Sequence, residues 1–338
     1  MRNNNRMSKL TAGIVLMGFL VIATSCAVIL GKDEPLPQFG FSFRFVETLR
    51  NEASLRGEGL KEVARNTDRA TTLQQPNSVF ADALGVYVTD SSPARIFVFD
   101  RGNRKVSILE GTPPPAQDAV ILLAPGCIVV DSAGTMFVSD AQQGRVFGYA
   151  KNGAVLFNIG RTGDLGLPTG LAVDNQRNRL YVADTHSHKI KVFNTIGTQL
   201  PDIGSSGRSE ESIKFPGSIA LDRQGNLHVL DTLKRRVQVY DVDGNFSRGF
   251  NLSDITPGFA IKPKGIAVDS DGHVYVTDSL SNNIMLFDKN GLFLFTWGRT
   301  GGFIGEFWTP SGIFIDDHDT IYIADQMNGR IQIFQYTK

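Results

Sequence analysis

The sequence predicts an all-β fold, a six-bladed β-propeller built from four-stranded antiparallel blades. Three observations predict it: one phrase occurs six times, its copies are 43 to 49 residues apart, and the chain combines 35 glycines with many Val, Ile, Phe and Tyr residues. Repeats of this length that hold three or four short strands are typical of propeller blades. Glycine-rich turns between β-branched and aromatic residues favour strands over helices.

The first 25 residues differ from the rest of the chain. Arg2, Arg6 and Lys9 precede a charge-free apolar run that ends in small residues before Cys26. This arrangement is typical of a secretory signal, and "ATSC" resembles a bacterial lipobox, in which the cysteine is acylated. The apolar run, about 16 residues long, is short for a membrane span. We expect a signal peptide over 1–25 and lipidation at Cys26; plain secretion and an uncleaved anchor are the alternatives.

The expected location is the bacterial cell envelope. By resemblance to such lipoproteins, Ala27 after the cysteine implies the outer membrane, with a secreted or periplasmic protein as the alternative. Residues 26–40 are expected to be a linker. The chain carries 34 basic and 34 acidic residues, and removing the signal leaves the domain slightly acidic. We expect no nucleic-acid partner, because an exported and nearly neutral chain has neither the charge nor the compartment for it. Cys127 is interpreted as a small buried residue.

The predicted propeller spans residues 41–338. Within each repeat, a proline and a small residue precede an apolar innermost strand; a turn leads to a second strand such as "LYVAD", and another turn leads to a third such as "RIQIF". In most repeats a fourth, outer strand follows, as at 154–160 and 292–298. The repeats begin near 75, 124, 167, 215, 262 and 309.

The last repeat ends after its third strand, so the ring needs a strand from elsewhere. Residues 41–49, "FSFRFVETL", alternate apolar and polar side chains, and we assign them as the outer strand of the final blade. The insertion at 50–75 contains "EGLKEVAR", which could form one or two helical turns. Its role is left open.

The chain resembles the NHL-repeat family. The motifs that carry the resemblance are "P-x-G-[IL]-A-[VL]-D", "[LI]-Y-V-[AT]-D-[ST]" and "x-N-x-R-[IV]-x-[VI]-F", best seen in "DQMNGRIQIF" at 325–334. With its lipobox-like start, the chain is also similar to bacterial NHL-repeat lipoproteins. The resemblance implies a six-bladed propeller that serves mostly as a binding platform.

Each repeat places an aspartate at the end of its second strand, and in five of the six a basic residue follows five positions later. We interpret these pairs as a structural brace across the second hairpin turn, because catalytic residues rarely recur in every repeat. A second aspartate closes each innermost strand and is expected to cap the next turn. The brace pairs are Asp90 and Arg95, Asp140 and Arg145, Asp184 and Lys189, Asp231 and Arg236, and Asp325 and Arg330.

Two histidines in "HSH", His186 and His188, invite a metal interpretation. They occupy the position where the other repeats have a hairpin turn, and zinc normally needs three or four protein ligands. We expect a turn and no metal site. His228, which replaces a tyrosine in its repeat, should be half-buried, while His273 and His318 should lie on the opposite face.

The resemblance extends to propeller enzymes, namely metal-dependent lactonases and a zinc-dependent lyase. Such enzymes need metal ligands where the inner strands begin, and no carboxylate or histidine stands there in this sequence. We therefore expect no catalytic residues and no cofactor. The predicted function is a non-catalytic protein-binding or assembly platform; a metal-dependent lactonase-type or lyase-type enzyme is the alternative.

The face of the second hairpin turns is the candidate binding surface, because basic residues gather there. A basic rim favours docking of an acidic protein partner in the cell envelope. The protein would contact the membrane through its lipid anchor. The oligomeric state is left open. The binding-face candidates are Arg161, Arg299, Lys234, Arg235, Lys264, His186 and His188.

Overall fold

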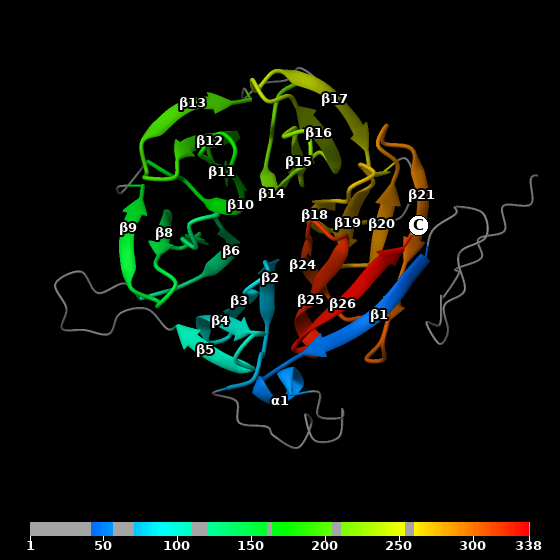
Figure 1. Ribbon diagram of the computed structural model, residues 1–338. Coiled ribbons are helices and arrows are strands. Elements are labelled where there is room, and N and C mark those ends of the chain that lie inside the picture. The colour runs from blue at the N-terminus through cyan, green and yellow to red at the C-terminus, as the bar shows by residue number, and fades with distance from the viewer. Residues whose placement is uncertain are drawn as a thin grey trace, which may run out of the picture.

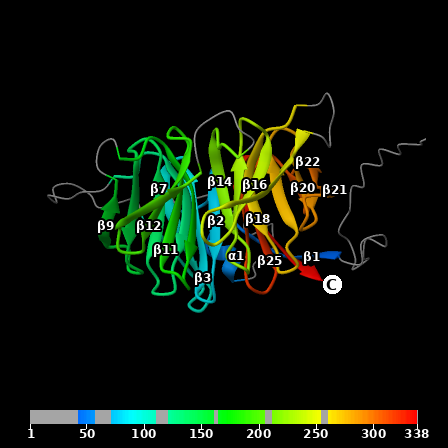
Figure 2. The same ribbon diagram turned by 90° about the horizontal axis from the view of Figure 1, so that it is seen from above.

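The computed structural model describes residues 42–56, 71–109, 121–160, 164–204, 211–253 and 260–337. Its strands form six four-stranded antiparallel sheets around a central axis (Figure 1). Figure 2 shows the same ring edge-on, with strands that run between its two faces. The predicted all-β, six-bladed propeller is confirmed.

Blades I to V each consist of four consecutive strands, in the order innermost to outermost. Every innermost strand begins at a proline. Proline is tolerated at the first residue of a strand, because the N–H that it lacks is not needed for the hydrogen bonds between the strands that follow. The strands are, in blade I, β2 (Pro76–Ala81), β3 (Gly85–Ser91), β4 (Ala94–Asp100) and β5 (Lys105–Leu109); in blade II, β6 (Pro125–Val130), β7 (Met136–Asp140), β8 (Arg145–Tyr149) and β9 (Val155–Ile159); in blade III, β10 (Pro168–Asp174), β11 (Arg179–Asp184), β12 (Lys189–Asn194) and β13 (Gln199–Ile203); in blade IV, β14 (Pro216–Leu221), β15 (Leu227–Asp231), β16 (Arg236–Tyr240) and β17 (Phe246–Asn251); and in blade V, β18 (Pro263–Val268), β19 (Val274–Asp278), β20 (Asn283–Phe287) and β21 (Phe293–Trp297).

Blade VI joins the two ends of the described chain. Its strands are β24 (Pro310–Ile315), β25 (Thr320–Asp325), β26 (Arg330–Thr337) and, outermost, β1 (Ser42–Leu49). Strand β1 pairs antiparallel with β26, with a register shift between Phe45 and Glu47 (Figure 1). The N-terminal strand therefore closes the ring, as the sequence predicts.

The remaining elements are short. Helix α1 (Glu52–Leu55) follows β1, and the Asn51 side chain caps it by accepting a hydrogen bond from the Ser54 N–H. The helical turns expected in "EGLKEVAR" lie outside the described residues. A 3₁₀ turn, η2 (Gln326–Asn328), joins β25 to β26. Between blades V and VI, β22 (Arg299–Thr300) pairs in parallel with β23 (Glu306–Phe307).

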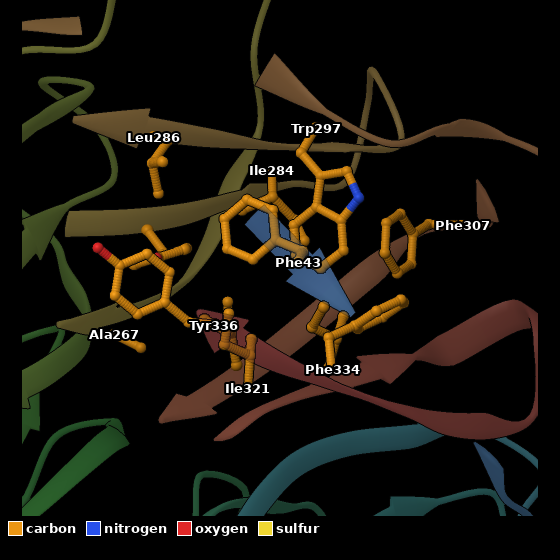
Figure 3. Close-up of a cluster of buried hydrophobic side chains, with 12 residues drawn as sticks. Phe43, Ala267, Ile284, Leu286, Trp297, Phe307, Ile321, Phe334 and Tyr336 are labelled. Atoms are coloured by element: carbon orange, nitrogen blue, oxygen red, sulfur yellow. The ribbon is translucent and has the colours of Figure 1, made fainter. Parts of the chain in front are cut away.

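The core consists of apolar layers between neighbouring blades. Figure 3 shows the layer between blades V and VI, where Phe43 from β1 stacks on Trp297 with ring centroids 4.7 Å apart. Phe334 meets the same indole edge to face at 4.6 Å. Because single blades cannot bury both of their faces, this radial packing supplies the apolar burial that stabilises the fold. None of the described helices is long and apolar enough to cross a membrane.

The ring has two faces, which we name by the course of the inner strands. The entry face, where the inner strands begin, carries the turns at 91–94, 141–144, 185–188, 232–235, 279–282 and 326–329. The exit face, where they end, carries the turns at 82–84, 131–135, 174–178, 222–226, 269–273 and 316–319.

Candidate functional site

The described candidate residues all lie on the entry face. Turns and strand starts there hold His186, His188, Lys234, Arg235, Lys264 and Arg299. Arg161 and Cys26 lie outside the described residues, as do the signal and the linker. The described set is thus gathered on one face but spread over blades III to VI.

The "HSH" segment forms a hairpin turn between β11 and β12. His188 adopts a positive φ of 58°, its Nδ1 hydrogen-bonds the Lys214 carbonyl, and its ring packs edge to face on Phe215 at 4.8 Å. His186 is exposed. The His188 imidazole is thus engaged with the next blade, and the part of the chain that the structure describes holds no group of three or more His, Cys, Asp or Glu side chains suited to a metal.

Two of the basic candidates are held by neighbouring groups. Lys234 Nζ donates to the carbonyl oxygen and the hydroxyl of Ser212 at 2.9 and 3.0 Å. Arg299 forms an ion pair with Glu306 at 2.8 Å. These contacts fix the loops between blades III and IV and between blades V and VI. They make both side chains weaker docking candidates than the sequence alone suggests.

Lys264 and its neighbour Lys262 form an exposed positive pair. Both are exposed, at the start of the inner strand of blade V. Partial desolvation lowers the pKa of Lys264, and the charge of Lys262 lowers it further. Arg235 in the neighbouring blade is also exposed, with a positive φ of 50° in its turn. Among the described ion pairs of this face, none involves these three side chains.

The turns and connections of blades V and VI carry a group of exposed apolar side chains that the sequence alone did not reveal. We call it the apolar patch; it consists of Leu280, Phe303, Ile304, Trp308 and Met327, of which Phe303 is 80% exposed and Trp308 52%.

Backbone contacts hold the apolar patch together. The Met327 N–H donates to the Trp308 carbonyl at 3.0 Å, and the Ser279 N–H donates to the Lys262 carbonyl at 3.1 Å. The Thr309 N–H donates to Asn282 Oδ1 at 2.7 Å and joins the loop of blade VI to the turn of blade V. These bonds join the connection at Trp308, the turns at Leu280 and Met327, and the segment at Lys262 as adjoining parts of the entry face.

One signal in the sequence could have found this patch. Trp308 stands two residues before a repeat proline, in a connection where a large aromatic side chain has no blade face to cover. Its proximity to Leu280 and Met327 can be recognised only when the arrangement of the blades is known, because these two residues come from the turns of two neighbouring blades.

The brace aspartates serve mainly as acceptors for backbone N–H groups. Asp90, for example, accepts from Gln74, Gln75 and Ser92, which ties the entry loop to the second turn. The predicted ion pair forms in blade VI, where Arg330 lies 2.7 Å from Asp325, and more loosely in blade IV, at 3.5 Å. In blade III the expectation is wrong in detail. Lys189 lies 3.5 Å from Asp202 instead, because the outer strand offers a more exposed carboxylate.

The aspartates at the ends of the inner strands cap the exit-face turns, as predicted. Asp316 accepts from the His318 and Thr320 N–H groups. In blade I, Tyr87 donates its hydroxyl to Asp82 at 3.3 Å, and burial together with that carboxylate raises the pKa of the phenol. The described parts of the exit face thus carry fixed acidic groups around the axis.

His228 takes the tyrosine's place in blade IV. Its Nε2 lies 3.2 Å from Asp222, and the side chain is fully buried where half-burial was expected. Burial disfavours the ionised form of Asp222, but the hydrogen bonds from His228 and Asn226 outweigh it and lower the pKa. His273 and His318 lie in exit-face turns, as expected.

A central cavity of about 1260 Å³ opens on the exit face. Its lining reaches from the exit-face turns down to Ser78, Cys127, Ser218 and Gly312, near the beginnings of the inner strands. Cys127 is thus only partly covered, contrary to the buried position expected for it. The positions considered for metal ligands lie at the beginnings of the inner strands, whereas this cavity opens at their ends.

Near the entry end, neighbouring inner strands approach each other closely. A Cβ on Gly312 would lie 2.7 Å from the Asn77 carbonyl oxygen, and one on Gly265 would lie 2.5 Å from that of Ser311. The Ser311 hydroxyl also donates to the Asn77 carbonyl at 2.9 Å. Glycine is required at these positions because the neighbouring backbone occupies the space of a side chain.

Comparisons with known proteins agree with this architecture. Residues 165–193 match the NHL repeat, and residues 260–338 match a family described as 6-bladed beta-propeller, DUF5128. No curated protein matches the chain.

Among solved structures, the chain is similar to a streptogramin B lyase, with 14% identity over 78% of this chain and 94% of the other and a TM-score of 0.58. It is similar to a virginiamycin B lyase from Staphylococcus aureus, with 16% identity over 87% and 99% and the same TM-score. A protein of unknown function from Bacteroides thetaiotaomicron shows 17% identity over 79% and 71%, with a TM-score of 0.60. At these identities the likeness establishes the fold alone. The chain is a six-bladed β-propeller that carries an NHL repeat.

Proposed function

We propose that this protein is an exported, membrane-anchored and non-catalytic propeller that binds an acidic protein partner through its entry face. The observation that carries the proposal is the apolar patch on the face that also holds Lys262 and Lys264. Contiguous exposed apolar surface on a soluble domain is typical of protein interaction sites. Trp and Met are also enriched at the buried centres of such interfaces, which fits Trp308 and Met327.

The neighbouring charges set the kind of partner. Lys262 and Lys264 flank the first residue of the inner strand of blade V, whose second turn holds Leu280, and Arg235 lies in the corresponding turn of blade IV. None of the three has an acidic partner in the described ion pairs of this face. Desolvating an unpaired ammonium is unfavourable, so a partner that covers this region must supply carboxylates. The partner surface is therefore acidic around an apolar centre.

The anchoring part of the proposal rests on the sequence. The apolar run and "ATSC" support acylation of Cys26, and the following alanine supports the outer membrane. The 26–40 segment would then connect the lipid to the propeller. A secreted or periplasmic protein is the alternative location.

Charge reversal with a matched control tests the proposal. The entry-face variant Arg235→Glu, Lys262→Glu and Lys264→Glu is compared with an exit-face variant of equal charge change, Arg104→Glu, Lys151→Glu and Lys289→Glu. All six side chains are exposed. Full-length protein, anchor included, captures envelope proteins from membranes, and co-purifying proteins are identified by mass spectrometry.

We expect one discrete protein to co-purify with the wild type and the exit-face variant and to be lost from the entry-face variant. With that protein purified, the entry-face variant should associate about tenfold more slowly and with a weaker salt dependence. Equal capture by both variants would refute docking through this face. Lactone hydrolysis that a chelator abolishes would replace the platform with the enzymatic alternative.

A further inference from the structure

We propose that the central cavity binds a small organic cation with an apolar, ring-containing body. This site lies on the exit face and is separate from the proposed protein-binding surface. The inference rests on the size of the cavity, the unequal sides of its wall, and the sign of the charge at its mouth.

The cavity is large for a small-molecule site. Its volume of about 1260 Å³ exceeds the roughly 300–1,000 Å³ typical of small-molecule pockets. Because the lining includes the exit-face turns at 82–84, 131–134, 174–177 and 316–318, a ligand would enter and leave at the exit face. A molecule held there would be surrounded by inner strands of all six blades.

The cavity wall is aromatic on one side and small on the other. Phe80 in blade I and Phe314 in blade VI lie with ring centroids 4.6 Å apart. At the position that Phe80 and Phe314 occupy in their inner strands, blades III to V, across the axis, have alanines that line the cavity. These are Ala172 in blade III, Ala220 in blade IV and Ala267 in blade V.

The side chains at this position are therefore smaller in blades III to V than in blades I and VI, although Ala172 and Ala267 themselves are largely buried between blades. A body in the cavity would meet the two phenyl rings on one side and the inner strands of blades III to V on the other. Apolar contact with these walls, away from water, favours an aromatic or alicyclic body.

The mouth of the cavity is acidic. Seven aspartates and three arginines line the cavity, which gives a formal excess of four negative charges. Six of the aspartates are fixed by their turn amides; Asp131, for example, accepts from the Ala133 and Thr135 N–H groups. They are Asp82, Asp131, Asp174, Asp222, Asp269 and Asp316.

The three arginines are already engaged. Arg177 forms an ion pair with Asp174 at 2.9 Å, and Arg101 forms one with Glu47 at 2.7 Å. Arg223 reaches from blade IV to blade VI, where it donates to the Asp317 carbonyl at 2.6 Å. With all three arginines counted, the lining still has four more negative than positive charges, so the field at the mouth favours a cation.

Charge and wall together define the ligand class. Carboxylates around a low-dielectric opening raise the local concentration of cations and repel anions. A ligand with a cationic group near the acidic mouth and an apolar body against Phe80 and Phe314 would match both the charge and the wall of the cavity. The faces of phenyl rings also attract cations. Anions of the same shape should be excluded.

Two probes of matched shape and opposite charge test the proposal: tetraphenylphosphonium and tetraphenylborate. Isothermal titration calorimetry of the full-length protein in a neutral detergent measures the affinity and the stoichiometry of each probe. We expect one tetraphenylphosphonium per chain and at least about tenfold weaker binding of tetraphenylborate. Equal affinities for the two probes, or no binding of the cation, would overturn the proposal.

Substitutions locate the site. Ala220→Trp, and independently Ala172→Phe, fill the alanine side of the cavity and should weaken tetraphenylphosphonium binding by about tenfold or more. Asp317→Lys changes the charge of an exposed residue at the mouth of the cavity. It should weaken the binding of tetraphenylphosphonium and strengthen the binding of tetraphenylborate. Leu233→Ser, at a 63% exposed position of an entry-face turn outside the apolar patch, is the control and should change the binding of neither probe. Thermal unfolding identifies variants that fold; unchanged cation binding in a folded cavity-filling variant would refute the site.

Discussion

The side-chain oxygens of Ser42 and Thr337 lie 2.7 Å apart, although 295 positions separate these residues in the chain. They face each other at one end of the β1–β26 ladder. The contact places the two ends of the described chain in one blade. Stability of the ring should therefore depend on a strand that belongs to none of the six repeats.

Phe43 provides the sharpest test of this closure. It is 6% exposed and stacks on Trp297 (Figure 3), so Phe43→Ala leaves a cavity between blades V and VI. We expect a loss of about 3–5 kcal/mol in the free energy of unfolding, measured by urea denaturation. Val46→Ala, at a 45% exposed position of the same strand, is the control and should cost less than about 1 kcal/mol.

Deletion of residues 36–50 removes the closing strand entirely. It exposes the edge of β26, so we expect a lower melting temperature and aggregation, monitored by light scattering. A deletion variant that melts like the wild type would show that this strand does not hold the ring together.

The sequence was sufficient to predict this closure because a repeat that lacks one strand leaves an edge, and 41–49 has the alternation to fill it. The turn-capping aspartates were predictable for a similar reason, since each acts on its own turn. The apolar patch was not, because Trp308, Leu280 and Met327 come from different connections. The opening of the cavity on the exit face was also missed, since it requires the inner strands and turns of all six blades to be placed around one axis.

His228 stands where three other blades have a tyrosine that donates to the inner-strand aspartate, and its Nδ1 is buried without a hydrogen-bond partner. His228→Tyr should retain the bond to Asp222 and remove the unpaired nitrogen. We expect a gain of about 1 kcal/mol in the free energy of unfolding, and we expect His228→Phe to be about 1 kcal/mol less stable than His228→Tyr. Equal stability of the Tyr and Phe variants in urea would contradict this role.

His273 should make stability depend on pH. Its Nδ1 lies 2.9 Å from Asp269 Oδ2, and this hydrogen bond raises the pKa of the imidazole above its ordinary value of 6.5 although burial opposes the rise. A raised pKa in the folded state stabilises the protein below about pH 6.5, and this contribution is lost as the pH rises through the folded-state value.

The free-energy difference between wild type and His273→Gln should therefore be largest near pH 5.5 and shrink towards pH 9. Urea titrations at several pH values measure it. A difference that stays constant over this range would show that protonation of His273 does not couple to folding.

Acylation of Cys26 is tested by Cys26→Ala. Two or three acyl chains hold a domain stably to a membrane, so the variant should move to the soluble fraction and lose incorporation of labelled palmitate. Cys127→Ala is the matched control and should stay with the membrane. If the Cys26 variant also stays there, an uncleaved apolar segment is the anchor instead.

Partner binding at the apolar patch is the central claim, and site-specific photo-crosslinking tests it most directly. A benzophenone amino acid replaces Trp308 in the full-length protein, and a second variant carries it at Ile196, which is 78% exposed at a turn on the opposite face. After irradiation of intact cells, we predict one discrete protein adduct from position 308 and none of the same mass from position 196. The absence of an adduct at 308, or the same adduct from both positions, would contradict the account.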